Sequence, residues 1–116
     1  MSVVSGVTLI CGLGETGSAD PDVYDDDGTL LLKKLNAYLG SLEEHRSPEF
    51  VELSDQYGGY KHPQHLVFGA GINYLDEDRF AKEILSWPWK NPENVVLIIQ
   101  PEEGDTRVFR PGYAER

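Results

Sequence analysis

The sequence has too little cysteine, basic charge and continuous hydrophobicity for several common protein classes. Among its 116 residues Cys11 is the only cysteine, which excludes an internal disulfide and a cysteine-based zinc site. Only 10 Lys and Arg stand against 20 Asp and Glu, a formal net charge of -10. Because phosphate binding needs clustered basic residues, we expect no direct nucleic-acid binding.

The chain also lacks the segments that direct a protein to or through a membrane. No run approaches the roughly 18 apolar residues of a membrane span. No Lys or Arg precedes Lys33, so the N-terminal region does not have the charge pattern of a secretory leader. We therefore predict a cytoplasmic protein with no membrane partner.

What the chain does contain is typical of a folded protein. Its apolar fraction is 40%, with 2 Trp, 6 Tyr and 4 Phe, which is too rich in core-forming residues for a disordered chain. The length is that of a single domain, residues 1–116. The excess of acid fits high solubility, a cationic partner, or mimicry of a polyanion such as DNA.

Hydrophobic periodicity predicts two helices and five strands. Apolar residues recur every three or four positions from Thr29 to Leu42, and again between Asp76 and Pro88, as in helices with one buried face. Shorter apolar or alternating runs predict strands within residues 7–11, 50–53, 66–74, 95–99 and 106–110.

The resulting order, β-α-β-β-α-β-β, favours an α+β fold in which both helices cover one face of a mixed sheet. A two-layer, ferredoxin-like arrangement with an added C-terminal strand satisfies the handedness rule for both crossovers. The alternative is a small three-layer α/β fold with helices on both faces. It is favoured by the runs at 7–11 and 95–99, which are apolar at nearly every position, as in strands buried on both sides.

A glycine-spaced turn is the first candidate site. Gly12, Gly14 and Gly17 match the G-x-G-x-x-G spacing of a dinucleotide-binding turn and make a phosphate-loop candidate. That motif requires a helix to start at its third glycine and to offer free N–H groups to the pyrophosphate. Here the helix is expected only from about residue 28, after six acidic residues, so we favour a flexible turn at the end of a strand.

The acidic loop before the first helix is the second candidate. Clustered carboxylates are the ligands that Mg²⁺ and Ca²⁺ prefer, so a weak divalent site is one interpretation, and no other cofactor is expected. Helix capping, with Asp27 as the N-cap residue, is the simpler interpretation. The residues concerned are Asp20, Asp22, Asp25, Asp26 and Asp27.

Residues 25–30, D-D-D-G-T-L, also resemble the nucleophile motif of the haloacid dehalogenase-like phosphatases. In that family the first Asp attacks phosphorus, the second acts as acid and base, and both help to hold magnesium. The resemblance covers five positions, and the family's motif directly follows an apolar strand, whereas here the strand is predicted to end at Cys11. We therefore do not transfer the activity to this chain.

Aromatic and histidine side chains form the third group of candidates. Tyr and Trp are the usual anchors of protein interfaces. Two histidines three positions apart are too few for a metal site. We expect Trp87 to close the end of the core and Trp89 to be partly exposed. The candidate interface residues are Tyr57, Tyr60, His62, His65, Trp87 and Trp89.

No complete catalytic constellation occurs in the sequence, and no G-x-S-x-G motif is present. We therefore predict a small acidic, non-catalytic binding or assembly module that acts through protein–protein contact: an inhibitor, an immunity-type protein or a subunit of a complex. Its partner would be another protein or a second copy. The alternatives are an enzyme that handles a phosphate or nucleotide with Mg²⁺ at the loop of residues 12–27, and a mimic of DNA.

Overall fold

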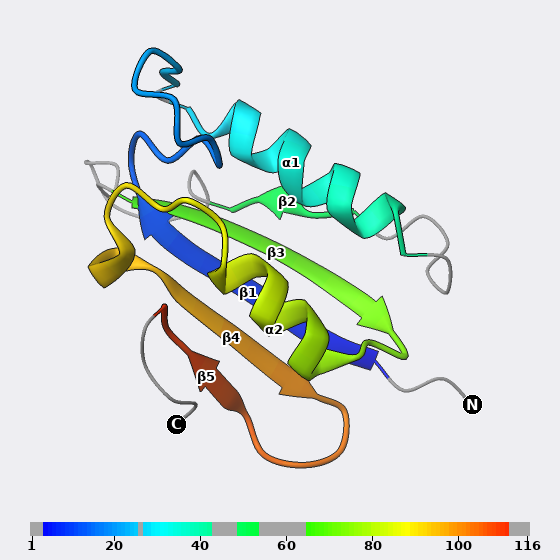
Figure 1. Cartoon of the computed structure of the whole chain (residues 1–116). Helices are drawn as coiled ribbons and strands as arrows, with labels where there is room; N and C mark the ends of the chain where they lie inside the picture. The colour runs from blue at the N-terminus through cyan, green and yellow to red at the C-terminus, as the bar shows by residue number, and fades with distance from the viewer. Residues whose placement is uncertain (1–3, 26, 43–48, 54–64, 112–116) are drawn as a thin grey trace, which may run out of the picture.

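A computed structural model describes residues 4–25, 27–42, 49–53 and 65–111 of the chain. These residues form one five-stranded sheet, two α-helices and a short 3₁₀ turn (Figure 1). The elements, in chain order, are β1 (Val4–Gly12), α1 (Thr29–Gly40), β2 (Val51–Glu52), β3 (His65–Asn73), α2 (Glu77–Leu85), η2 (Pro92–Asn94), β4 (Val96–Pro101) and β5 (Arg107–Phe109).

The sheet has the strand order β2-β3-β1-β4-β5 and every pair in it is antiparallel. The predicted α+β class is therefore confirmed, whereas the predicted mixed sheet is wrong. The reason is that β3 lies between β1 and β2, so the two strands that α1 connects run in the same direction without pairing.

Both helices lie on the same face of the sheet, in front of it in Figure 1. The three-layer alternative is thus wrong for the described part of the chain. Alternate residues of β1 point toward the helices and are buried, as the side-chain period of two requires. They join one core with residues from both helices, namely Val7, Leu9 and Cys11 of β1, Leu31, Leu35 and Leu39 of α1, and Phe80, Ala81 and Ile84 of α2.

The helices begin and end for local reasons. Asp76 caps α2, its carboxylate accepting a hydrogen bond from the Arg79 backbone N at 3.2 Å, and α2 ends before Pro88. The N-cap residue of α1 is Gly28, which has a left-handed φ of 78°, so the prediction of Asp27 is wrong by one position. A side chain at Gly28 would lie 3.1 Å from Leu66 and Phe68, so glycine is required there on two counts.

The glycines inside β3 do not produce a bulge, because the register with β1 runs unbroken from one end to the other. Gly69 instead allows a close approach: a Cβ at this position would lie 2.8 Å from Cδ1 of Leu53. Within the described residues no helix is long and apolar enough to cross a membrane.

Candidate functional site

The glycine turn after β1 is held against α1. Gly14 and Gly17 have φ values of 86° and 78°, which favour glycine. A Cβ at Gly17 would lie 2.6 Å from Cδ of Lys34, and Nζ of Lys34 donates a hydrogen bond to the Gly17 carbonyl at 2.5 Å. Since α1 begins only at Thr29, the third glycine of the motif does not start a helix.

Glu15, inside this turn, is completely buried and is a residue that sequence reasoning missed. Its two carboxylate oxygens accept hydrogen bonds from the backbone N–H groups of Lys90 and Asn91, each at 2.9 Å. The side chain therefore ties the loop after β1 to the segment after α2. The two N–H donors that could have held an external anion are occupied by this internal carboxylate.

Cys11 lies beside Glu15 at the end of β1. Burial and, to a smaller extent, the negative charge of Glu15 raise the pKa of the Cys11 thiol to about 12. The thiol is therefore neutral and shielded from solvent, and Cys11 packs as a small buried hydrophobe.

Two aspartates bind the first N–H groups of α1 from outside the helix. Asp25 accepts hydrogen bonds from the backbone N of Leu30 at 2.7 Å and of Asp27 at 3.1 Å. Asp27 accepts one from the backbone N of Thr29 at 3.0 Å. Hydrogen bonds with the Thr29 side chain first, and with Asp25 second, lower the pKa of Asp27 to about 2.

The start of α1 therefore presents carboxylates where a phosphate site would present free N–H groups. Asp20 is engaged separately, in a turn where it accepts a hydrogen bond from the backbone N of Asp22 at 2.9 Å. Asp26 lies outside the described residues. Among those described, no group of three or more His, Cys, Asp or Glu is placed to hold a metal ion. The divalent site stays a prediction.

The two tryptophans pack at the end of the core. Trp87 is buried, donates a hydrogen bond from Nε1 to Glu83 at 2.7 Å, and has Nζ of Lys34 4.5 Å above its ring. Trp89 is partly buried and donates to the carbonyl of Ile84 at 3.0 Å. The burial of Trp87 and the partial exposure of Trp89 agree with the prediction, whereas a role for either in an interface stays a prediction. His65 is the first residue of β3, whereas Tyr57, Tyr60 and His62 lie outside the described residues.

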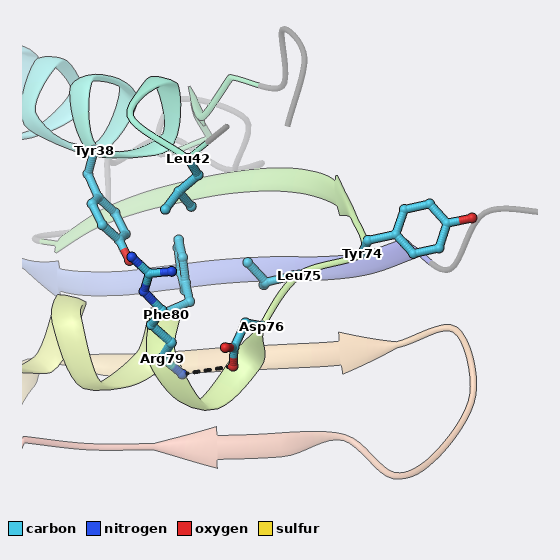
Figure 2. A pocket seen from close by; sticks show the side chains of 7 residues that line it. All are labelled: Tyr38, Leu42, Tyr74, Leu75, Asp76, Arg79 and Phe80. Carbon is cyan, nitrogen blue, oxygen red and sulfur yellow. Dashed lines mark hydrogen bonds between the residues drawn. The ribbon is translucent and has the colours of Figure 1, made fainter. Parts of the chain in front are cut away.

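A small cavity of about 160 Å³ lies between the end of α1 and the start of α2. In Figure 2 the guanidinium of Arg79 extends toward the hydroxyl of Tyr38, and Tyr74 points away from both. Burial first, and then the charge of Glu83, raise the pKa of Tyr38, so its hydroxyl is neutral at physiological pH. The lining residues are Tyr38, Leu42, Tyr74, Leu75, Asp76, Arg79 and Phe80.

The chemistry of this cavity is limited. Asp76 is engaged in capping α2, and the floor is formed by apolar side chains such as Phe80. Neither a nucleophile paired with a base nor a pair of close carboxylates is found among its lining residues.

One face of the sheet is turned away from both described helices (Figure 1). The strand registers place alternate residues of all five strands on it. We call this set the open face; it comprises Val4, Gly6, Thr8, Ile10, Gly12, Val51, His65, Val67, Gly69, Gly71, Asn73, Val96, Ile98, Gln100 and Val108.

The open face is mostly apolar. None of its residues is Asp, Glu, Lys or Arg, although the chain holds 20 acids and 10 bases. Val51 is 54% exposed, and Ile10, Val96 and Ile98 are partly buried although they belong to the most hydrophobic runs of the chain. Part of the face is covered within the chain, since Val67 is only 5% exposed and the Leu53 side chain lies over Gly69. Antiparallel sheets covered on one side ordinarily alternate apolar and polar residues, so this face departs from the usual pattern.

Comparisons of this chain with protein-family models, with curated proteins and with solved structures find no match.

Proposed function

We propose that this protein is a small, non-catalytic binding or assembly module that contacts a partner protein through the open face of its sheet. The observation that carries the proposal is the combination of hydrophobicity and missing charge on this one face of a chain with a net charge of -10. Contiguous exposed apolar surface on a soluble domain marks an interaction site.

The hydrophobic energy available on this face supports the same conclusion. Ile10 and Ile98 retain accessible apolar area that a partner would remove from water. Burial yields about 25 cal/mol per Å² of apolar area, so each of these partly exposed side chains contributes roughly 1 kcal/mol to an association. The charged surface elsewhere favours the solubility of the unbound chain.

The fold that presents this face is, in our proposal, a ferredoxin-like arrangement extended by a C-terminal strand. The order β2-β3-β1-β4 with antiparallel pairing supports this assignment, as do the two helices that connect β1 to β2 and β3 to β4. In this arrangement β5 lengthens the sheet beyond β4 and widens the open face.

Affinity capture with two matched variants tests the function. Gly71→Lys places an ammonium group on the open face, at a position where a Cβ meets nothing nearer than Val4 at 3.9 Å. Gly40→Lys adds the same group to the end of α1, where a Cβ meets nothing within 4 Å. We expect the wild type and Gly40→Lys to retain the same protein from extracts of cells that express the chain, and Gly71→Lys to lose it.

A partner that Gly71→Lys retains in full would contradict the use of the open face. A chain that captures no protein and does not self-associate would overturn the proposed function itself.

A further inference from the structure

We infer that the partner of the open face is a second copy of this chain, and that two copies pack sheet against sheet as a symmetric dimer. This inference rests on the proposed function and specifies it. Three properties of the open face support it: its charge, its relief and its area.

The charge distribution favours a second copy over a basic partner. Two molecules that each carry a charge of -10 repel one another wherever their acidic surfaces meet. The open face has no Asp, Glu, Lys or Arg, so it is a place where like-charged copies can approach without opposing acids. A basic partner would instead be recognised by acidic side chains, which this face does not have.

The relief of the face is self-complementary. Gly6 and Gly71 lie side by side in the register of β1 and β3, and neither has a side chain above the sheet. Ile10 and Val96 are also paired, and with Ile98 they form a ridge over β1 and β4. In a two-fold dimer each residue pair occurs twice, so the ridge of one copy can fill the glycine floor of the other.

The area of the face suits a weak dimer. The five strands have 9, 2, 9, 6 and 3 residues. At about 16 Å² per residue, from a rise of about 3.3 Å and a strand spacing of about 4.8 Å, the whole face covers roughly 450 Å². Part of it is already covered in the monomer, since Val67 is 5% exposed and Leu53 lies over Gly69. Two copies thus bury less than roughly 1,000 Å², which is the size of a weak interface. We therefore expect a dimer that forms at micromolar or higher concentration.

Sedimentation equilibrium of the full chain, from micromolar to near-millimolar protein, tests this arrangement. The wild type and Gly40→Lys are expected to dimerise equally. Gly71→Lys is expected to weaken the dimer by at least about tenfold, because its ammonium must be desolvated between two apolar layers. Both variants add the same charge to the chain and fit the monomer, so overall repulsion and misfolding affect them alike.

Circular dichroism and thermal melts of the variants establish that each is folded. A wild type that stays monomeric at the highest concentration overturns the dimer, and so does a dimer that Gly71→Lys leaves intact. If the wild type is monomeric but loses a captured partner on Gly71→Lys, the proposed function stands and self-association does not. If the wild type is monomeric and captures nothing, both the dimer and the proposed function are overturned.

Discussion

Both faces of the sheet carry apolar side chains, yet only one of them is covered by the described helices. On β4, Ile99 is completely buried beneath the helical layer, whereas its neighbour Ile98 points the other way and is only half-buried. On β1, Leu9 and Ile10 show the same contrast. Hydrophobicity beyond what the monomer's own helices can cover is therefore available for binding, and the two faces make separable contributions to stability and to association.

Substituting the two adjacent isoleucines gives the largest effect and tests this comparison most directly. Ile99→Ala leaves a cavity in the core and is expected to lower the free energy of unfolding by about 4 kcal/mol. Ile98→Ala removes partly buried atoms and is expected to cost about 2 kcal/mol, since part of the side chain stays in water and no enclosed cavity is left. Urea denaturation at low micromolar protein, where the monomer dominates, measures both.

Comparable losses for the two alanine variants would show that the open face is buried within the monomer. The comparison between the faces would then fail, and the proposed interface with it.

The Glu15 carboxylate, in the loop after β1, stabilises the side of the sheet that the helices cover. Glu15→Ala leaves the buried N–H groups of Lys90 and Asn91 without their acceptor and is expected to cost about 2 kcal/mol. Glu103→Ala, at an exposed position in the turn between β4 and β5, is the control and is expected to change little. If the two variants unfold at the same urea concentration, Glu15 does not tie the loop to the segment after α2.

The capping aspartates secure the helix that covers one half of the sheet. Asp25→Ala removes the acceptor for the backbone N of Leu30 and is expected to cost about 1 kcal/mol. Asp22→Ala is the matched control, because the Asp22 carboxylate accepts no hydrogen bond from the described residues and its loss is expected to be near zero. Both are read from thermal unfolding. Equal melting temperatures for the two variants would show that Asp25 does not stabilise the start of α1.

The sequence predicts well those features that depend on residues close together in the chain, and poorly those that depend on distant ones. The apolar stripe of α1 and the extent of β3 through its glycines follow from local periodicity and were predicted closely. The burial of Glu15 was not, because its partners Lys90 and Asn91 lie 75 and 76 positions away and no local pattern announces them.

The open face shows a second limit of sequence reasoning. Runs such as residues 95–99 are apolar on both sides, which supports the three-layer alternative with helices on both faces. Periodicity tells which side chains avoid water but not what shields them. A helix of the same chain and a second molecule leave the same pattern in the sequence.

The smallest effect concerns the pH dependence of the helical layer. The folded-state pKa of Asp27 is about 2, below its ordinary value of 3.8, so this group stabilises the folded chain above pH 3.8. That contribution is lost as the pH falls through 3.8 toward 2, when the carboxylate is protonated and releases Thr29. Asp27→Asn lacks this stabilising contribution at every pH. The difference in urea midpoint between wild type and variant is therefore expected to narrow on acidification from pH 5 to pH 2.

Thr29→Val removes the hydroxyl that lowers the Asp27 pKa most, and it is expected to raise that pKa toward 3.8 in an NMR titration. A difference in urea midpoint that stays constant with pH, or an unchanged Asp27 pKa in Thr29→Val, would show that protonation of Asp27 does not affect the stability of α1. Because these changes act on the helices and leave the open face untouched, the dimer interface should keep its affinity for as long as the chain stays folded.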